Sequence, residues 1–417
     1  MRAAAPRPLA DRRFRRLFAA QVVSLLGSGL TTVALALLAY DLAGDDAGVV
    51  LGAALALKMV AYVLVAPTVA GLLDRVPRRR LLVGLDLARA AVAFSLPWIG
   101  EVWQALLLVF ALSACSAGFT PTFQAAIPDV LEDEERYTRA LSLSRLAYEL
   151  ENLLSPTLAA LALLVLSYSV LFAINGVAFL ASALLVAGVA LPARRPAPGG
   201  GASAWARITF GVRRYLRVPR LRALLTLDLA VACASAMVIV NTVVVVHERL
   251  GRPSSSDVAL VLAASGLGAM AVALVLPRVV VGTGYRRPML AGGLALSGAL
   301  VGIALADDLV VVLLVWLLTG AALALVETPS GRVVHRSERD GDGPALFAAQ
   351  FSLSHACWLV AYPLAGGLGA TVGITATGLI LAAIALSAAL IARRLWTTDR
   401  PIPVGDSRAV GAPVELG

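Results

Sequence analysis

Long apolar runs separated by short polar segments extend along almost the whole chain of 417 residues. A helix needs about 20 apolar residues to cross the hydrocarbon core of a bilayer, and the chain contains twelve runs of this kind. They cover residues 17–40, 48–73, 81–100, 103–123, 141–166, 169–191, 223–246, 257–277, 288–306, 309–328, 346–369 and 371–392. Because backbone polar groups in lipid must bond internally, the pattern predicts an all-α integral membrane protein with twelve transmembrane helices.

The distribution of basic residues predicts how these helices are oriented. With the N-terminus in the cytoplasm, the outer loops hold only Arg249 and Arg252 of the 35 Lys and Arg residues, and three more lie within spans. All the others fall on the inner side, as the positive-inside rule requires. The arginine-rich, lysine-poor composition favours a bacterial source. We therefore expect a multi-pass bacterial plasma-membrane protein with both termini cytoplasmic, whose net charge of +9 does not indicate nucleic-acid binding.

Short matches that recur at nearly one spacing indicate an internal duplication. Arg79-Arg80 recurs as Arg286-Arg287, Thr120-Pro121 as Thr328-Pro329, the Ser-Leu-Ser of 142–144 at 352–354, and Pro156 as Pro363. Each pair falls in an equivalent helix or loop, which predicts two pseudo-symmetric six-helix bundles. We expect an N-terminal half at 1–191, a cytoplasmic linker with an amphipathic helix at 192–222, a C-terminal half at 223–392 and a cytoplasmic tail at 393–417.

The loop between the second and third spans carries the most specific motif of the chain. Its residues include Gly71, Asp74, Arg75, Arg78, Arg79 and Arg80, and so many charges require it to lie at a membrane surface. The motif resembles the Gly-x-Leu-x-Asp-Arg-x-Gly-Arg-Arg loop of major facilitator superfamily transporters, with Ala70 and Pro77 in place of two glycines. The resemblance implies the major facilitator fold, in which this gating loop works as a conformational latch.

Two other segments resemble the drug- and siderophore-exporting branch of that superfamily. One is Leu-Ala-Asp-Arg-Arg-Phe-Arg-Arg-Leu at 9–17, and the other joins Phe-Thr-Pro at 119–121 to Ile-Pro-Asp at 127–129. The resemblance implies a secondary active transporter that exports lipophilic small molecules, such as drugs or siderophores, against protons by alternating access. Its partners would be the substrate, protons and the lipid bilayer, and the expected state is a monomer.

Two departures from that branch leave alternatives open. The fourth span lacks the arginine of many proton-coupled exporters, and the fifth has Ser155-Pro156 where Gly-Pro is usual. An importer, a uniporter or a lipid translocator on the same scaffold therefore remains an alternative, and a non-transporting membrane sensor is a further one. The chain has no G-x-x-x-x-G-K-[ST] loop and no Ser-His-Asp or Cys/His cluster, so we expect neither an enzyme nor a bound metal or cofactor.

Carboxylates within the spans are the candidates for proton coupling, because burial in lipid is costly and is retained for function. Glu149 and Glu151 lie near the middle of the fifth span, and being two residues apart they point in nearly opposite directions. Arg145 lies one turn before Glu149, so we expect Glu149 to be its partner and Glu151 to be the freer group to titrate. Asp228 in the seventh span is the third candidate.

The remaining polar residues in the spans have other expected roles. Lys58 is the only lysine and lies roughly 15 Å into the second span, where it fits a structural ion pair, a counter-ion or a contact to a substrate anion. Asp86 and Arg89 are spaced to pair with each other. Candidates to line a central cavity are Gln21, Asn241, Glu327 and His355. Glu327 also fits a solvated helix end, and His355 an interhelical histidine.

Overall fold

The structure is a computed structural model that describes residues 8–43, 47–73, 76–131, 133–163, 165–191, 203–252, 255–339 and 341–396. The first helices are α1 (Arg12–Ala43), α2 (Ala47–Leu72), α3 (Arg78–Ser95), α4 (Val102–Val130), α5 (Glu134–Leu163) and α6 (Tyr168–Ala187). A short helix, α7 (Ala204–Arg217), precedes α8 (Pro219–Val244), α9 (Ser255–Thr283), α10 (Arg286–Leu305), α11 (Leu309–His335) and α12 (Gly343–Leu395). No strand occurs in these ranges.

The helices account for the twelve spans that the hydrophobic pattern predicts. Nine helices in the described part are long and apolar enough to cross a membrane, with α12 counted once. The positive φ of 81° at Gly373 breaks α12 into two helices, each of spanning length. With 32 and 30 residues, α1 and α5 are also long enough to cross a bilayer. The prediction of an all-α membrane fold is confirmed.

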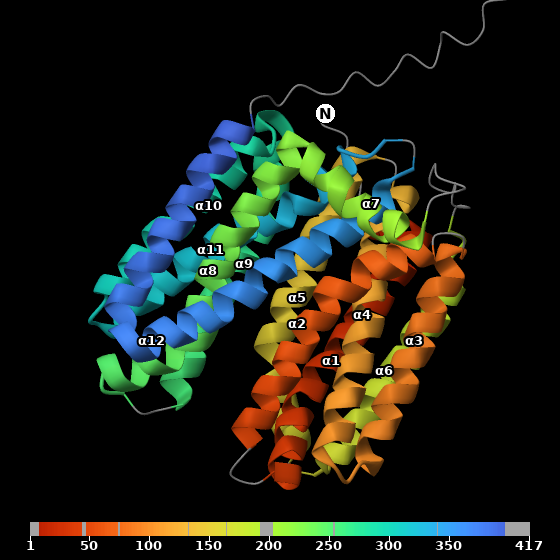
Figure 1. The fold of residues 1–417 in the computed structure, drawn as a ribbon, viewed down its shortest axis with the longest axis horizontal. Helices are drawn as coiled ribbons and strands as arrows, with labels where there is room; N and C mark the ends of the chain where they lie inside the picture. The colour runs from red at the N-terminus through yellow and green to blue at the C-terminus, as the bar shows by residue number, and fades with distance from the viewer. Residues whose placement is uncertain are drawn as a thin grey trace, which may run out of the picture.

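The spans pack into two groups that lie on either side of the molecule in Figure 1. In the first group α6 packs on α1 and α3, and α4 packs on α2 and α3. In the second group α12 packs on α8 and α10, and α11 packs on α9 and α10. The equivalent pairings confirm the two pseudo-symmetric bundles. The domain limits at residues 191, 222 and 392 stay a prediction.

Glycines allow the closest helix crossing in the second bundle. A Cβ at Gly320 of α11 would overlap the carbonyl oxygen of Ser265, and a Cβ at Gly268 of α9 would overlap the carbonyl oxygen of Leu317. The backbones of α9 and α11 therefore touch at these two positions. Any side chain there pushes the helices apart, because a packed interior has no room to absorb the added volume.

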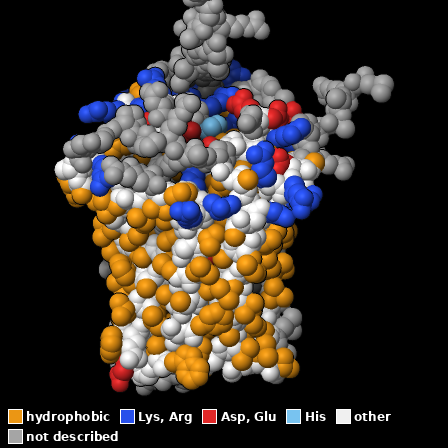
Figure 2. Space-filling view, turned by 90° about the vertical axis from the view of Figure 1, so that its right-hand side faces the viewer, with side chains coloured by type: hydrophobic (Ala, Val, Ile, Leu, Met, Phe, Trp, Pro, Cys, Tyr) orange, Lys and Arg blue, Asp and Glu red, His pale blue; other side chains and the backbone are white. Residues whose placement is uncertain are grey.

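Basic side chains gather at one end of the molecule, above a band of hydrophobic surface (Figure 2). This end carries α7, and we call it the linker end. Helix α7 crosses from one bundle to the other, since Gly71 of α2 lies against the backbone of Ile208 and Gly211 lies against Ala345 of α12. One face of α7 therefore packs on protein, whereas Trp205 is exposed.

A cluster of polar side chains joins the two bundles at the linker end. Glu134, in the first turn of α5, accepts a hydrogen bond of 2.8 Å from Nε of Arg332 in the last turn of α11. It also pairs with Arg336, the residue directly after that helix. Arg332 also donates to Thr138, and its guanidinium lies 4.3 Å from the ring centre of Tyr285. We call these residues the gate cluster: Glu134, Thr138, Tyr285, Arg332 and Arg336.

A second contact between the bundles runs along α2 and α12. The hydroxyl of Ser352 donates to the carbonyl oxygen of Val63 over 2.5 Å, and the rings of Tyr62 and Phe351 lie 5.1 Å apart. These contacts and the gate cluster all lie in the linker-end half of their helices. The bundles are therefore joined at the linker end, and the opposite ends of their helices diverge in Figure 1.

Removal of the Glu134 charge is expected to loosen the linker end. Glu134→Gln loses the ion pairs to two arginines, and each partly exposed pair contributes up to about 1 kcal/mol, or about a fivefold change in population. Spin labels on the linker ends of α5 and α11 will report a larger fraction of molecules with a long distance. The control is Glu135→Gln, which removes only a pair within α5 to Arg139. Equal distance distributions for both variants would contradict the assignment of the gate cluster.

Addition of one methyl group at the α9–α11 crossing is expected to destabilise the protein. Gly320→Ala forces an overlap with Ser265 that costs roughly 1–3 kcal/mol, so the unfolding temperature in detergent falls by several degrees. Gly298→Ala on α10 is the control, because no atom lies within 4 Å of the added Cβ. Equal unfolding temperatures for the two variants would show that α9 and α11 do not cross this closely.

Candidate functional site

A cluster of three charges connects the bundles midway along their helices. Arg145 and Glu149 of α5 form an ion pair one helical turn apart. The same guanidinium lies 2.9 Å from a carboxylate oxygen of Glu327, which belongs to α11 in the other bundle. All three side chains are largely buried. One arginine thus holds a carboxylate from each half of the molecule, and we call Arg145, Glu149 and Glu327 the charge triad.

The position of Glu327 corrects one expectation from the sequence. The hydrophobic run ends at residue 328, which placed Glu327 at a solvated helix end. In the structure α11 continues for two more turns to His335, so Glu327 lies inside the helix and faces Arg145. The helix continues because the segment after Pro329 is amphipathic and packs at the linker end, where Val333 and Val334 are buried. The interpretation of Glu327 as a solvated end is therefore wrong.

The charge triad contains two carboxylates and one guanidinium, so it carries one surplus negative charge when both acids are ionised. A surplus charge in a low-dielectric region is costly, and uptake of one proton by either carboxylate leaves a balanced ion pair. The proton also removes one of the two attractions on Arg145. If Glu327 is the group that takes the proton, the link between the bundles is weakened. The geometry can therefore couple proton binding to the distance between the halves.

Polar contacts within the first bundle hold the triad in place. The hydroxyl of Ser144, next to Arg145, donates to Oε1 of Gln21 on α1 over 2.9 Å. Gln21 is buried, so it ties α1 to α5. This contact fixes the rotation of α5 about its axis, and with it the direction in which Arg145 points.

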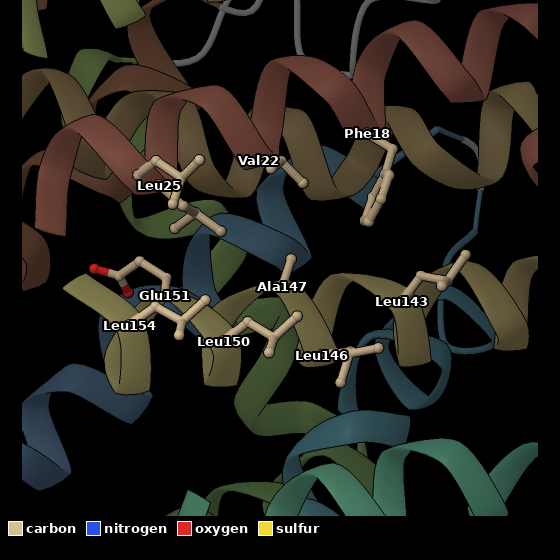
Figure 3. Close-up of a pocket in the computed structure, with 10 residues that line it drawn as sticks. Phe18, Val22, Leu25, Leu143, Leu146, Ala147, Leu150, Glu151 and Leu154 are labelled. Atoms are coloured by element: carbon tan, nitrogen blue, oxygen red, sulfur yellow. The ribbon is translucent and has the colours of Figure 1, made fainter. Parts of the chain in front are cut away.

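Glu151 lies on a different side of α5 from the triad. It lines an apolar cavity of about 310 Å³ between α1 and α5 (Figure 3). The other lining residues are Phe18, Val22, Leu25, Leu26, Leu143, Leu146, Ala147, Leu150 and Leu154. Leu150 and Leu154, which also line the cavity, are exposed. The structure thus separates Glu149 from Glu151, and it brings Glu149 to the interface between the bundles.

Asp86 and Arg89 form a closed pair inside the first bundle. Their side chains make an ion pair on α3, and Asp86 also accepts a hydrogen bond of 2.8 Å from Ser182 of α6. The guanidinium of Arg89 lies between two rings, with its central carbon 4.0 Å from the ring centre of Phe119 and 4.4 Å from that of Phe179. These partners come from three helices of one bundle, which fits a structural role.

Asp228 lies in the core of the second bundle. Nε2 of Gln350 on α12 donates to its carboxylate over 2.8 Å, and Oε1 of Gln350 accepts a hydrogen bond from the hydroxyl of Tyr215 on α7. Asn241, four turns further along α8, donates to the carbonyl oxygen of Ala365 over 3.3 Å. Both residues therefore tie α8 to α12. No cation pairs with Asp228 in the described part of the chain.

Aromatic rings surround His355 at the contact between α2 and α12. The His355 ring lies 4.8 Å from Tyr62, 4.2 Å from Phe351 and 5.2 Å from Trp358, measured between ring centres. Lys58 lies beside this group, with Nζ 5.7 Å from the Tyr62 ring centre. The sequence contains the signal for this cluster, since Phe351, His355 and Trp358 follow a helical spacing of four and three residues.

The gating loop is described only in part, because Asp74 and Arg75 lie outside the described residues. Arg78 pairs with Asp129 at the end of α4 and donates to the carbonyl oxygen of Ala125 over 3.2 Å. Arg79 and Arg80 are exposed. Arg78 therefore bonds a helix end of its own bundle. At the linker end, ion pairs across the bundles come from the gate cluster, which sequence reasoning missed. In the described part of the chain, no group of three or more His, Cys, Asp or Glu side chains is placed to hold a metal ion.

Comparison with known proteins connects this geometry with a protein family. Residues 17–339 match the Major Facilitator Superfamily. The chain is 28% identical over 185 residues to macrolide efflux protein A of Streptococcus pyogenes, covering 43% of this chain and 45% of that protein. It is 27% identical over 328 residues to the uncharacterized MFS-type transporter YfiS of Bacillus subtilis, covering 75% of this chain and 76% of that protein. The match to the macrolide efflux protein thus spans less than half of its length.

Solved structures share the arrangement of helices. The human organic anion transporter MFSD10 superimposes with a TM-score of 0.80 at 16% identity, covering 91% of this chain and 99% of that chain. The E. coli fucose:proton symporter FucP superimposes with a TM-score of 0.72 at 15% identity, covering 92% and 98%. Such low identities show the fold alone. Together with the family match over most of the chain, they show that this protein belongs to the Major Facilitator Superfamily and is a multi-pass membrane transporter rather than an enzyme.

Proposed function

We propose that the protein is a proton-coupled exporter of lipophilic small molecules, with the charge triad as its coupling site. The observation that carries this proposal is the single guanidinium of Arg145, which holds Glu149 of one bundle and Glu327 of the other. The similarity to macrolide efflux protein A supports export of a lipophilic compound, over less than half of that relative's length. Asp228 becomes a secondary candidate because its hydrogen bond comes from Gln350 of its own bundle, and Glu151 becomes one because it lines the apolar cavity between α1 and α5.

The orientation follows from the charge distribution. We propose that the linker end, where the Lys and Arg side chains gather, faces the cytoplasm (Figure 2). Both termini would then be cytoplasmic, in a bacterial plasma membrane. The two halves would be residues 1–191 and 223–392, joined by the cytoplasmic linker 192–222. The structure, joined at the linker end, would correspond to the outward-facing state.

The transport cycle follows from the electrostatics of the triad. In the outward-facing state, a proton from outside binds Glu149 or Glu327 and removes the surplus negative charge. When the proton is on Glu327, Arg145 holds only Glu149 of its own bundle, and the gate cluster and the contact between α2 and α12 keep the linker end closed. The inward-facing state becomes more populated, because the contact between the bundles at the linker end stabilises only the outward-facing state, in which that end is closed. Release of the proton to the cytoplasm and binding of substrate restore the triad, and the protein returns outward with its cargo.

The fold itself does not decide the direction of transport, since the E. coli relative with the same fold is named a symporter. An importer, a uniporter or a lipid translocator would use the same helices. Antiport makes a distinct prediction in inside-out vesicles with an imposed proton gradient, acid inside. A transported compound added outside such vesicles dissipates the gradient only if its movement is exchanged for protons.

Neutralisation of either triad carboxylate is expected to abolish coupling. Glu149→Gln and Glu327→Gln remove the surplus charge permanently, so proton binding can no longer alter the contact between the halves. With a panel of macrolides, dyes and siderophores, the wild type will dissipate the gradient for at least one compound, and both variants will lose at least 90% of that response. The control is Glu151→Gln, which removes the same charge two residues away on the side of the apolar cavity.

Binding of the active compound to each purified variant separates coupling from folding. The triad variants are expected to bind it with an affinity close to that of the wild type. Normal gradient dissipation by both triad variants, or loss of the response in Glu151→Gln alone, would contradict the assignment of the triad. If no compound of the panel dissipates the gradient in wild-type vesicles, but one of them is taken up without any gradient, the protein is a uniporter.

A further inference from the structure

Lys58 differs from the arginines that lie within the spanning helices. Arg89, Arg145 and Arg332 each form an ion pair with a carboxylate. Lys58 makes no hydrogen bond or ion pair with any residue in the described part of the chain, and its Nζ lies 5.7 Å from the centre of the Tyr62 ring. It lies eleven residues after the start of α2, about 17 Å along the helix and near the membrane midplane.

The ammonium of Lys58 lies on the face of α2 that packs on the second bundle. Tyr62, one turn further along the helix, lies on the same face and contacts the rings of Phe351 and His355 on α12. The interface between the bundles therefore passes directly beside Lys58.

A ladder of rings continues along α12 beyond this contact. His355 lies 5.2 Å from Trp358, and Trp358 lies 6.1 Å from Tyr362, measured between ring centres. Helices α2 and α12 run in opposite directions here, since α2 ends at the linker end and α12 begins there. Lys58 lies one turn further from the linker end than Tyr62, and Trp358 lies one turn further from it than His355, so the two side chains lie at a similar level. The ends of the two bundles opposite the linker end diverge (Figure 1).

This arrangement has the chemistry of a binding site for a negatively charged ring system. A charged side chain near the bilayer centre costs about 2.5–3.5 kcal/mol or more unless it is compensated, and no side chain of the described chain compensates Lys58. An anion from outside the protein would do so. The faces of aromatic side chains stack on planar ligands and leave one edge free for the charged group to meet the ammonium.

We propose that Lys58, Tyr62, His355 and Trp358 form a substrate subsite for an aromatic organic anion, meaning a planar ring system with one carboxylate or sulfonate group. The proposal rests on the proposed transport function and names the class of molecule that is carried. Repulsion by the ammonium disfavours an aromatic cation at this subsite. The depth of Lys58 disfavours the phosphate of a lipid headgroup, which lies at the membrane surface about 15 Å away.

The test is direct binding to the purified full-length protein by calorimetry, with detergent micelles alone as the blank. The probes are naphthalene-2-carboxylate and naphthalene-2-carboxamide, which share one ring system and differ in charge. The wild type is expected to bind the carboxylate at least tenfold more tightly than the carboxamide. Lys58→Met is expected to lose that preference, and Lys58→Arg is expected to keep it within a few-fold.

Two further variants control for other causes. Arg252→Gln removes a positive charge at the far end of the molecule, where it pairs with Asp257, and is expected to leave the binding of both probes unchanged. Trp358→Leu is expected to weaken both probes, because it removes a stacking surface and no charge. Equal affinity of the wild type for the two probes, absence of carboxylate binding, or an unchanged preference in Lys58→Met would each overturn the proposal.

The assay uses no proton gradient, so it is independent of the coupling mechanism. Loss of the carboxylate preference in Lys58→Met, together with normal gradient responses in the triad variants, would support the subsite and refute the triad. Retention of the carboxylate preference in Lys58→Met, together with loss of the gradient response in the triad variants, would support the triad and refute the subsite. The retained binding of the carboxamide to Lys58→Met would show that this variant is folded.

Discussion

The contact of Arg145 with one carboxylate from each bundle is the interaction on which the proposed transport cycle depends most. Glu149 shares a helix with Arg145, whereas Glu327 comes from the other bundle. A buried ion pair contributes little net stability compared with apolar packing, but removal of one partner leaves an uncompensated charge. In the proposed cycle the contact between the bundles therefore depends on the charge balance of the triad, and a proton is the smallest ligand that alters that balance.

The other buried charges show how the protein confines this sensitivity to the interface. Asp86 and Arg89 are satisfied by Ser182 and two aromatic rings of their own bundle. A rigid-body movement of one bundle against the other leaves those contacts intact. Asp228 likewise receives its hydrogen bond from within the second bundle. Charges with partners inside one bundle keep that bundle rigid, and charges at the interface respond when the bundles move.

The gate cluster and α7 add mechanical constraint at the linker end. Glu134 at the start of α5 pairs with Arg332 and Arg336 at the end of α11, so a small rotation of either bundle separates the carboxylate from both arginines together. Helix α7 lies across both bundles and contacts α2 and α12. The linker ends of the two bundles can therefore separate only when these contacts break. This arrangement agrees with a family whose members are transporters.

The sequence predicts the local features of this site and misses the tertiary ones. The twelve spans follow from hydrophobic runs, and the ion pair of Arg145 with Glu149 follows from a spacing of one turn. The partner across the bundles could not be found in this way, because hydropathy ends the tenth span at residue 328 while backbone hydrogen bonding continues α11 to His335. The gate cluster joins residues almost 200 positions apart, which no spacing rule detects.

The central claim is that proton occupancy of the triad controls the contact between the halves at the linker end. The most direct measurement is the spin-label distance across that end at pH 8 and at pH 5.5, in a Glu134→Gln background that removes the gate carboxylate. Acidification is predicted to increase the long-distance population when the triad is intact, and to have no effect when Glu149 and Glu327 are both replaced by Gln. A distance distribution that is the same at both pH values with the triad intact would contradict the account.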